Sequence, residues 1–113
     1  MATIFNPQFN CAFEVDDELV AFMAGHGFKP WHAGGGCFAW RRDLSFPNGW
    51  TPYDLITLGH DELGSWAERS HAGWNVGRYD EECSEFIESP GEQSLQECLD
   101  WIHIFNPGMP RNA

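Results

Sequence analysis

The sequence predicts a single domain of mixed α+β class, residues 1–113, in which a sheet is flanked by an N-terminal and a C-terminal helix. Apolar residues recur at helical spacing near both ends of the chain, and short apolar or aromatic runs separated by turns lie between. These runs predict an antiparallel sheet of about four to five short strands. The aromatic share of 15% supplies large buried areas for one core.

The first predicted helix begins at Asp16 or Asp17, because an aspartate accepts hydrogen bonds from the free N–H groups of a first helical turn. Its apolar face is a stripe at i, i+3 and i+4: Leu19, Phe22 and Met23. Gly25 or Gly27 supplies the left-handed residue that ends the helix, and Phe28 packs back on the last turn. The Asn-Pro pair at residues 6–7, which precedes this helix, indicates a turn or loop.

The strands follow the first helix in one continuous series. The predicted ranges are residues 28–33, 37–42, 53–58, 72–79 and 83–88. Three glycines, residues 34–36, form the turn of a hairpin between the first two strands. Turns at residues 47–49, 59–64 and 80–82 connect the others.

The last predicted helix ends near Phe105. Two serine–glutamate pairs can form a capping box at its start: Ser94 with Glu97, or Ser89 with Glu92. Its apolar stripe consists of Leu95, Cys98, Leu99 and Ile102. We expect both helices to cover one face of the sheet, because each has an apolar stripe to bury.

Charge is the most unusual property of the composition. Seventeen acidic residues against six basic ones give a formal net charge of −11. This field disfavours direct binding to nucleic acid or to anionic membranes, because both carry negative charge. No apolar run reaches the ~20 residues of a membrane span, and the first ten residues lack the features of a secretory signal, so we expect a cytoplasmic protein. Solubility alone is the alternative explanation of the acidity.

No catalytic or metal-binding motif occurs at a diagnostic spacing, so we expect no enzyme, no cofactor and no metal. The cysteines are Cys11, Cys37, Cys83 and Cys98. They form no C-x-x-C pair, and we expect reduced, mostly buried thiols. The strongest alternative is a small enzyme or metal-dependent domain that uses His26, His32 and Cys37. The glycines at 34–36 precede a strand, which favours a hairpin turn over a phosphate-binding loop.

Two features indicate binding to another macromolecule. Residues 80–100 contain eight acidic residues and no lysine or arginine: Asp80, Glu81, Glu82, Glu85, Glu88, Glu92, Glu97 and Asp100. Such a surface could imitate a row of phosphates, although an ordinary solvated helix face has the same composition. Trp50 and Trp66 lie in turn-rich segments and are therefore the tryptophans expected at the surface, where tryptophan is enriched in binding hot spots.

The sequence thus predicts a small acidic protein that binds a larger protein and blocks its basic, nucleic-acid-binding surface. Small inhibitors and adaptors share this profile, including anti-defence proteins of phages and mobile elements such as anti-CRISPR inhibitors. An oligomerising structural protein that uses its surface tryptophans is a further alternative.

Overall fold

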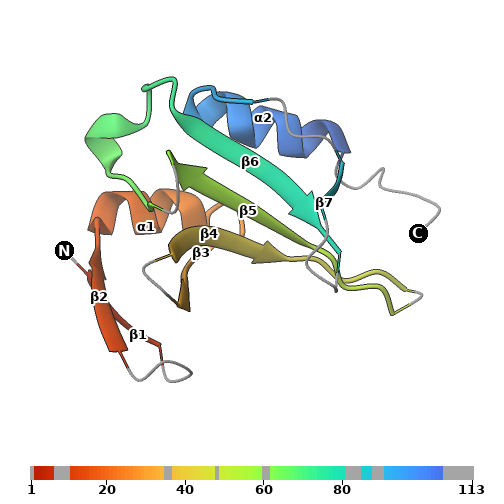
Figure 1. Cartoon of the computed structure of the whole chain (residues 1–113), viewed down its shortest axis with the longest axis horizontal. Coiled ribbons are helices and arrows are strands. Elements are labelled where there is room, and N and C mark those ends of the chain that lie inside the picture. The colour runs from red at the N-terminus through yellow and green to blue at the C-terminus, as the bar shows by residue number, and fades with distance from the viewer. Residues whose placement is uncertain are drawn as a thin grey trace.

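The computed structural model describes residues 2–6, 11–34, 37–47, 49–59, 62–80, 85–87 and 91–105. Figure 1 shows the elements in chain order. They are β1 (Ala2–Asn6), β2 (Cys11–Val15), α1 (Asp17–Ala24), β3 (Lys29–Gly34), β4 (Cys37–Asp43), β5 (Tyr53–Leu58), the 3₁₀ turn η1 (Trp66–Glu68), β6 (Trp74–Tyr79), β7 (Glu85–Ile87) and α2 (Leu95–Phe105).

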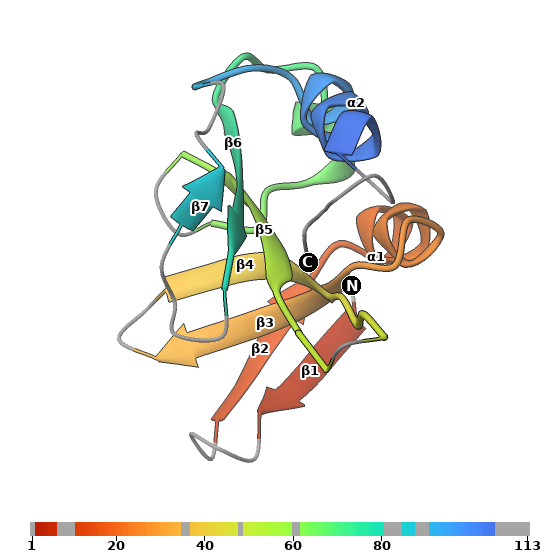
Figure 2. The ribbon, with the colours of Figure 1, turned by 90° about the vertical axis from the view of Figure 1, so that its right-hand side faces the viewer.

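The main sheet pairs its strands in the order β3-β4-β5-β6-β7, and every pair is antiparallel. Strands that follow one another in the chain are therefore neighbours in the sheet, as short connections favour. The sheet is strongly twisted, and in Figure 2 β3 and β4 run across the direction of β6. The mixed α+β class and the antiparallel sheet are confirmed.

The predicted placement of a helix at the N-terminal end is wrong. A separate hairpin precedes α1, in which β1 pairs antiparallel with β2 from Ala2 opposite Val15 to Asn6 opposite Cys11. Within it, Val15 is buried and Ile4 packs against the core, whereas Phe5 remains 58% exposed. Each strand has only five residues, too short for its alternation to stand out in the sequence.

Both helices lie on the same side of the main sheet in Figure 2. The buried residues they contribute are Leu19 and Met23 from α1 and Leu95, Cys98, Leu99 and Ile102 from α2. They pack against Trp40, Ile56, Trp74 and Val76 of the sheet. Both predicted stripes are confirmed, except that Phe22 is only partly buried. In the described part of the chain, no helix is long and apolar enough to cross a membrane.

The ends of α1 follow from its flanking residues. Asp16 Oδ1 accepts hydrogen bonds from the backbone N–H groups of Glu18 (2.9 Å) and Leu19 (3.4 Å), which identifies Asp16 as the N-cap. Gly27 takes the left-handed conformation (φ 87°) after the last turn. Phe28 is buried, and its N–H donates to the carbonyl of Met23. The predicted cap, stop and packing are confirmed.

The segment that carries η1 is held over the core by two buried tryptophans. The indole N–H of Trp40 donates to the carbonyl of Leu63 (2.7 Å), and that of Trp74 donates to the carbonyl of Glu68 (3.0 Å). Gly64 has a φ of 71°, and a Cβ there would lie 2.7 Å from the Trp74 ring, so only glycine fits. Residues 63–68 are thereby fixed beside the two helices.

Candidate partner-binding site

The structure describes only some of the acidic residues predicted to bind a partner. Outside the described residues lie Glu81, Glu82 and Glu88. For Glu85 only the backbone, in β7, is described. Asp80 is half-buried just after β6, whereas Glu92, Glu97 and Asp100 are exposed. We call these last three residues the α2 acidic group.

The α2 acidic group lies at the start and on the solvent side of α2. Glu97 and Asp100 are exposed, while the apolar stripe of the same helix is fully buried. Glu92 is exposed three residues before the helix begins. Acidic and apolar side chains therefore occupy different faces of this helix.

Hydrogen bonds hold two of these carboxylates in place. The N–H of Ser94 donates to Glu97 Oε1 (2.9 Å), and the N–H of Glu97 donates to Ser94 Oγ (3.2 Å). This is a capping box, and it confirms the first of the two predicted serine–glutamate pairs. One turn further on, Gln96 Nε2 donates to Asp100 Oδ1 (3.0 Å). The carboxylates of Glu97 and Asp100 are therefore positioned by residues 94 and 96.

A cavity of about 270 Å³ lies beside the α2 acidic group, and we call it the α1–α2 pocket. Its lining comes from α1, from η1 and the turn after it, and from the start of α2: Phe22, Trp66, Arg69, Ser70, Ser94, Leu95 and Gln96. Ser94 and Gln96 are the residues that hydrogen-bond Glu97 and Asp100. The pocket and the acidic group therefore form one continuous surface.

The walls of the pocket are joined by polar contacts. Asp16 Oδ2 accepts a hydrogen bond from the N–H of Trp66 (3.1 Å), which links the cap of α1 to η1. This bond, more than those from Leu19 and Glu18, holds the pKa of the Asp16 carboxyl below its ordinary value of 3.8. The N–H of Leu95 donates to the carbonyl of Arg69 (3.0 Å), which ties the start of α2 to the same segment.

The aromatic part of the pocket is Phe22 and Trp66. Their rings meet edge to face with centroids 5.2 Å apart. The guanidinium of Arg69 lies 4.1 Å from the centroid of the Trp66 ring, and its Nη1 donates to the Trp66 carbonyl (2.6 Å). Within the described part of the chain, no ion pair joins Arg69 to a carboxylate. The residue as a whole is exposed.

The two tryptophans predicted to be exposed are instead half-buried. Trp66 packs against the core and forms a pocket wall. Trp50 lies in the connection between β4 and β5, where its ring meets that of Phe46 at 5.0 Å. The exposure prediction was therefore too high for both residues, because Trp66 packs against the core and the ring of Trp50 meets a neighbouring ring within its own connection.

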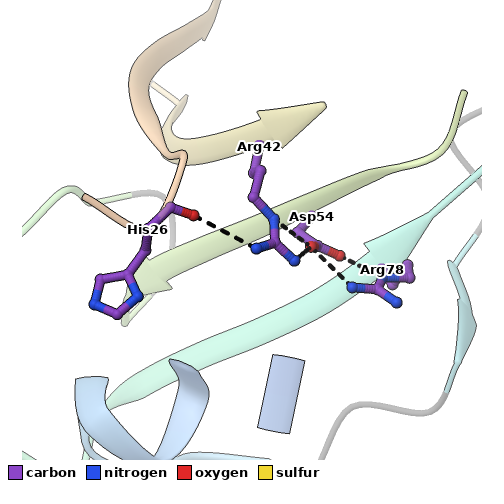
Figure 3. Close-up of polar contacts among 4 residues, drawn as sticks. All are labelled: His26, Arg42, Asp54 and Arg78. Atoms are coloured by element: carbon purple, nitrogen blue, oxygen red, sulfur yellow. Dashed lines mark hydrogen bonds and ion pairs between the residues drawn. The ribbon is translucent and has the colours of Figure 1, made fainter. Parts of the chain in front are cut away.

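A second charged cluster is buried on the helix-facing side of the sheet. Asp54 of β5 stands opposite Arg42 of β4 and Arg78 of β6 (Figure 3). Arg78 donates to Asp54 through Nε (2.6 Å) and Nη2 (3.0 Å), and Arg42 through Nη2 (2.8 Å) and Nε (3.1 Å). The side chains of Asp54 and Arg78 are 0% exposed and that of Arg42 is 12% exposed. Arg42 also donates to the carbonyl of His26 (3.4 Å).

This buried cluster changes the charge that the rest of the chain presents. The chain has seventeen acidic and six basic residues, and the cluster contains one of the acidic and two of the basic residues. Sixteen acidic and four basic residues therefore lie outside the cluster. Of those four, Arg41 is paired with Asp43 at 2.9 Å. The molecular surface is therefore more one-sidedly acidic than the net charge of −11 indicates.

The residues of the alternative enzyme or metal hypothesis do not come together as one site. His32 stacks on Phe38 with centroids 4.7 Å apart, and Cys37 is half-buried at the start of β4. His26 lies after α1, with its ring 5.8 Å from that of His103. Burial, and then the neighbouring His103 and Arg42, lower the pKa of His26 below 6.5. Across the described residues, no three histidine, cysteine or acidic side chains are grouped as metal ligands.

The predicted core position of Cys98 is confirmed. Its side chain is fully buried in α2, and burial raises the pKa of its thiol to about 12. A thiol that stays protonated is a poor nucleophile and a poor metal ligand. Among the described residues, neither Cys37 nor Cys98 forms a disulfide bond, whereas Cys83 and the side chain of Cys11 lie outside the described part.

Comparison with protein-family models, with curated proteins and with solved structures finds no match to this chain. Sequence reasoning missed most of the pocket, including Arg69 and Ser70, because residues 65–71 carry no periodic pattern. The three-residue spacing of Trp66 and Arg69 is a sequence feature that could have indicated their contact.

Proposed function

We propose that this protein is a small acidic inhibitor that docks on the basic, nucleic-acid-binding surface of a larger cytoplasmic protein. The docking surface is the α2 acidic group together with the adjoining α1–α2 pocket. An anti-defence role against a nucleic-acid-binding complex belongs to this class of function.

The observation that carries the proposal is the excess of acidic over basic residues outside the buried cluster, which the burial of two arginines increases. Asp54 binds two arginines inside the sheet, while Glu97 and Asp100 of α2 and Glu92, three residues before α2, remain exposed. Long-range attraction to a basic surface would speed association and align the two proteins. A fixed carboxylate suits this role because less side-chain freedom is lost on binding, and Glu97 and Asp100 are already held by hydrogen bonds.

Competition with nucleic acid tests the proposal. The immobilised protein is incubated with cell lysate at low salt, and bound proteins are challenged with duplex DNA or with RNA. We expect a nucleic-acid-binding protein to be released, and we expect the free protein to block nucleic-acid binding by that purified partner. Capture of proteins that nucleic acid does not displace would contradict the proposed function.

A charge-matched pair of variants separates the docking surface from net charge. The test variant carries Glu92→Gln and Asp100→Asn, and the control carries Glu14→Gln and Glu62→Gln, all four positions being exposed. Both lose two negative charges. We expect the test variant to associate about tenfold more slowly at low salt and the control to stay near the parent. Equal loss in both variants would mean that net charge acts without a defined site.

A further inference from the structure

The α1–α2 pocket has the size of a site for one side chain. Small-molecule sites usually enclose about 300–1,000 Å³. The pocket, at about 270 Å³, is below that range and is lined by residues of α1, of η1 and the turn after it, and of the start of α2. A single large side chain fills such a space, and a protein partner supplies it.

The pocket walls favour an aromatic side chain. Phe22 and Trp66 already form one edge-to-face pair, and Leu95 adds an apolar floor. A third ring can meet both aromatic walls in the offset or edge-to-face arrangements that aromatic pairs prefer. Aromatic anchors in pockets of this kind commonly carry a large share of the binding energy of an interface.

The polar groups at the rim fit a peptide backbone. Arg69 keeps several N–H donors that no carboxylate of the described chain engages, and Ser70 and Gln96 add further polar groups. A peptide segment presents backbone carbonyls, which accept such hydrogen bonds without carrying charge. The N–H of Ser94 already donates to Glu97, so the start of α2 is occupied by the protein's own carboxylate.

The acidic side chains beside the pocket favour a basic peptide segment. Ser94 and Gln96 line the pocket, and each hydrogen-bonds an exposed carboxylate, Glu97 or Asp100. Glu18 precedes Phe22 by one helical turn and is exposed on α1. A lysine or arginine next to the inserted ring would therefore meet a carboxylate. The net charge of −11 opposes a free aromatic anion, despite the nearby Arg69.

From these observations we infer that the α1–α2 pocket binds an aromatic side chain on a basic, extended peptide segment of the partner. The ring lies against Phe22 and Trp66, a backbone carbonyl accepts from Arg69, and flanking cations pair with Glu97 and Asp100. This inference rests on the proposed function, since it names the chemistry of the partner segment that docks there.

Capped synthetic pentapeptides test the inference directly. The first contains phenylalanine between two pairs of lysines, the second replaces phenylalanine by alanine, and the third replaces the lysines by glutamine. Binding is followed by NMR on the indole N–H of Trp66 and the amides of Ser70 and Gln96. We expect the first peptide to shift these signals, and each of the others to bind about tenfold more weakly or worse. Equal binding of the alanine peptide would overturn the inference.

A pocket-filling variant supplies the matched control. Ser70 and Ser45 are both exposed, but only Ser70 lines the pocket. Ser70→Trp should weaken binding of the phenylalanine peptide about tenfold or more, and Ser45→Trp should leave it unchanged. Benzoate serves as a free aromatic anion. Saturable binding of benzoate at these signals without peptide binding would overturn the inference in favour of a small-molecule site.

The outcomes distinguish this inference from the proposed function. If nucleic acid displaces a captured partner and Ser70→Trp captures that partner as well as the parent does, the pocket inference alone is wrong. If the phenylalanine peptide binds in the pocket but no captured protein is displaced by nucleic acid, the proposed function alone is wrong.

Discussion

The buried cluster in the sheet and the α2 acidic group use charge in opposite ways. Asp54 is completely buried and accepts four hydrogen bonds from two arginines. Glu92, Glu97 and Asp100 are exposed, and within the described residues no ion pair joins them to lysine or arginine. A buried charge requires partners because its desolvation is costly, whereas an exposed charge remains hydrated and acts at a distance. We therefore assign the buried cluster to the stability of the fold, and we propose that the α2 acidic group acts in recognition.

The two regions are also linked, because the first determines how basic the surface is. Each arginine that Asp54 holds inside the sheet is one that cannot neutralise a surface carboxylate. The cluster faces the helices from the side of the sheet that also carries Ile56 and Val76, in the same alternation. Arg42, Asp54 and Arg78 therefore take part in the packing of the interior, and their burial also increases the excess of acidic over basic residues outside the cluster.

The largest expected effect of a single substitution is that of Asp54→Asn. It would leave two buried guanidinium groups without their carboxylate, and removal of one member of a buried ion pair typically costs about 3 to 5 kcal/mol. Urea unfolding followed by circular dichroism measures the free energy of unfolding. Asp43→Asn is the matched control, because Asp43 pairs with Arg41 at the exposed surface, where such pairs contribute about 0 to 1 kcal/mol. A cost for Asp54→Asn as small as that of Asp43→Asn would remove the distinction between the two regions.

The elements predicted best from the sequence are those with a local physical signature. Asp16 and Gly27 mark the ends of α1, and Ser94 with Glu97 marks the start of α2. The apolar stripes of both helices and the pairing of β3 with β4 follow from spacing and turn residues. These signals lie within a few residues of one another, so no knowledge of the tertiary structure is needed.

The features that the sequence did not predict depend on long-range contacts. Asp54 and its two arginines lie on three different strands, so no local spacing in the sequence brings them together. The pocket joins Phe22, Trp66 and Leu95 from distant parts of the chain. Pairing across strands and packing between helices depend on the tertiary arrangement, which periodicity alone does not determine. Candidate sites built from such contacts become visible only in the structure.

The next largest expected effect is that of Asp16→Ala. The substitution removes the N-cap of α1, at a typical cost of about 1 to 2 kcal/mol, and it also removes the acceptor for the N–H of Trp66. Asp16→Asn separates the two roles, since its single amide oxygen can cap α1 about as well as aspartate but leaves no second oxygen to accept from the N–H of Trp66. We expect the alanine variant to lower the midpoint of urea unfolding and to weaken binding of the phenylalanine peptide. A peptide affinity equal to that of the parent would mean that Asp16 does not organise the pocket.

A smaller effect is expected from pH, through His26. Its pKa is below 6.5 in the folded protein because of burial, followed by the charges of His103 and Arg42. The unfolded chain therefore binds more protons in this range, so stability is full above about pH 6.5 and declines as the pH falls through the lower folded-state value. His26→Gln should flatten this part of the stability–pH curve, and the exposed His71→Gln should leave it unchanged. An unaltered slope in His26→Gln would assign the pH dependence to other groups.

The smallest expected effect on stability belongs to the α2 acidic group. Glu92→Gln with Asp100→Asn removes two exposed charges, and asparagine at 100 keeps an acceptor for Gln96 Nε2. Surface substitutions of this kind change the free energy of unfolding by about 0.5 kcal/mol or less. The sign should be slightly favourable at low salt, because the chain carries a net charge of −11 and loses self-repulsion, and it should vanish as salt screens the charges. Urea unfolding at two salt concentrations measures this. A loss of more than 1 kcal/mol would place these carboxylates, like Asp54, among the residues that hold the fold together, and slower partner association by the variant could then no longer be assigned to recognition.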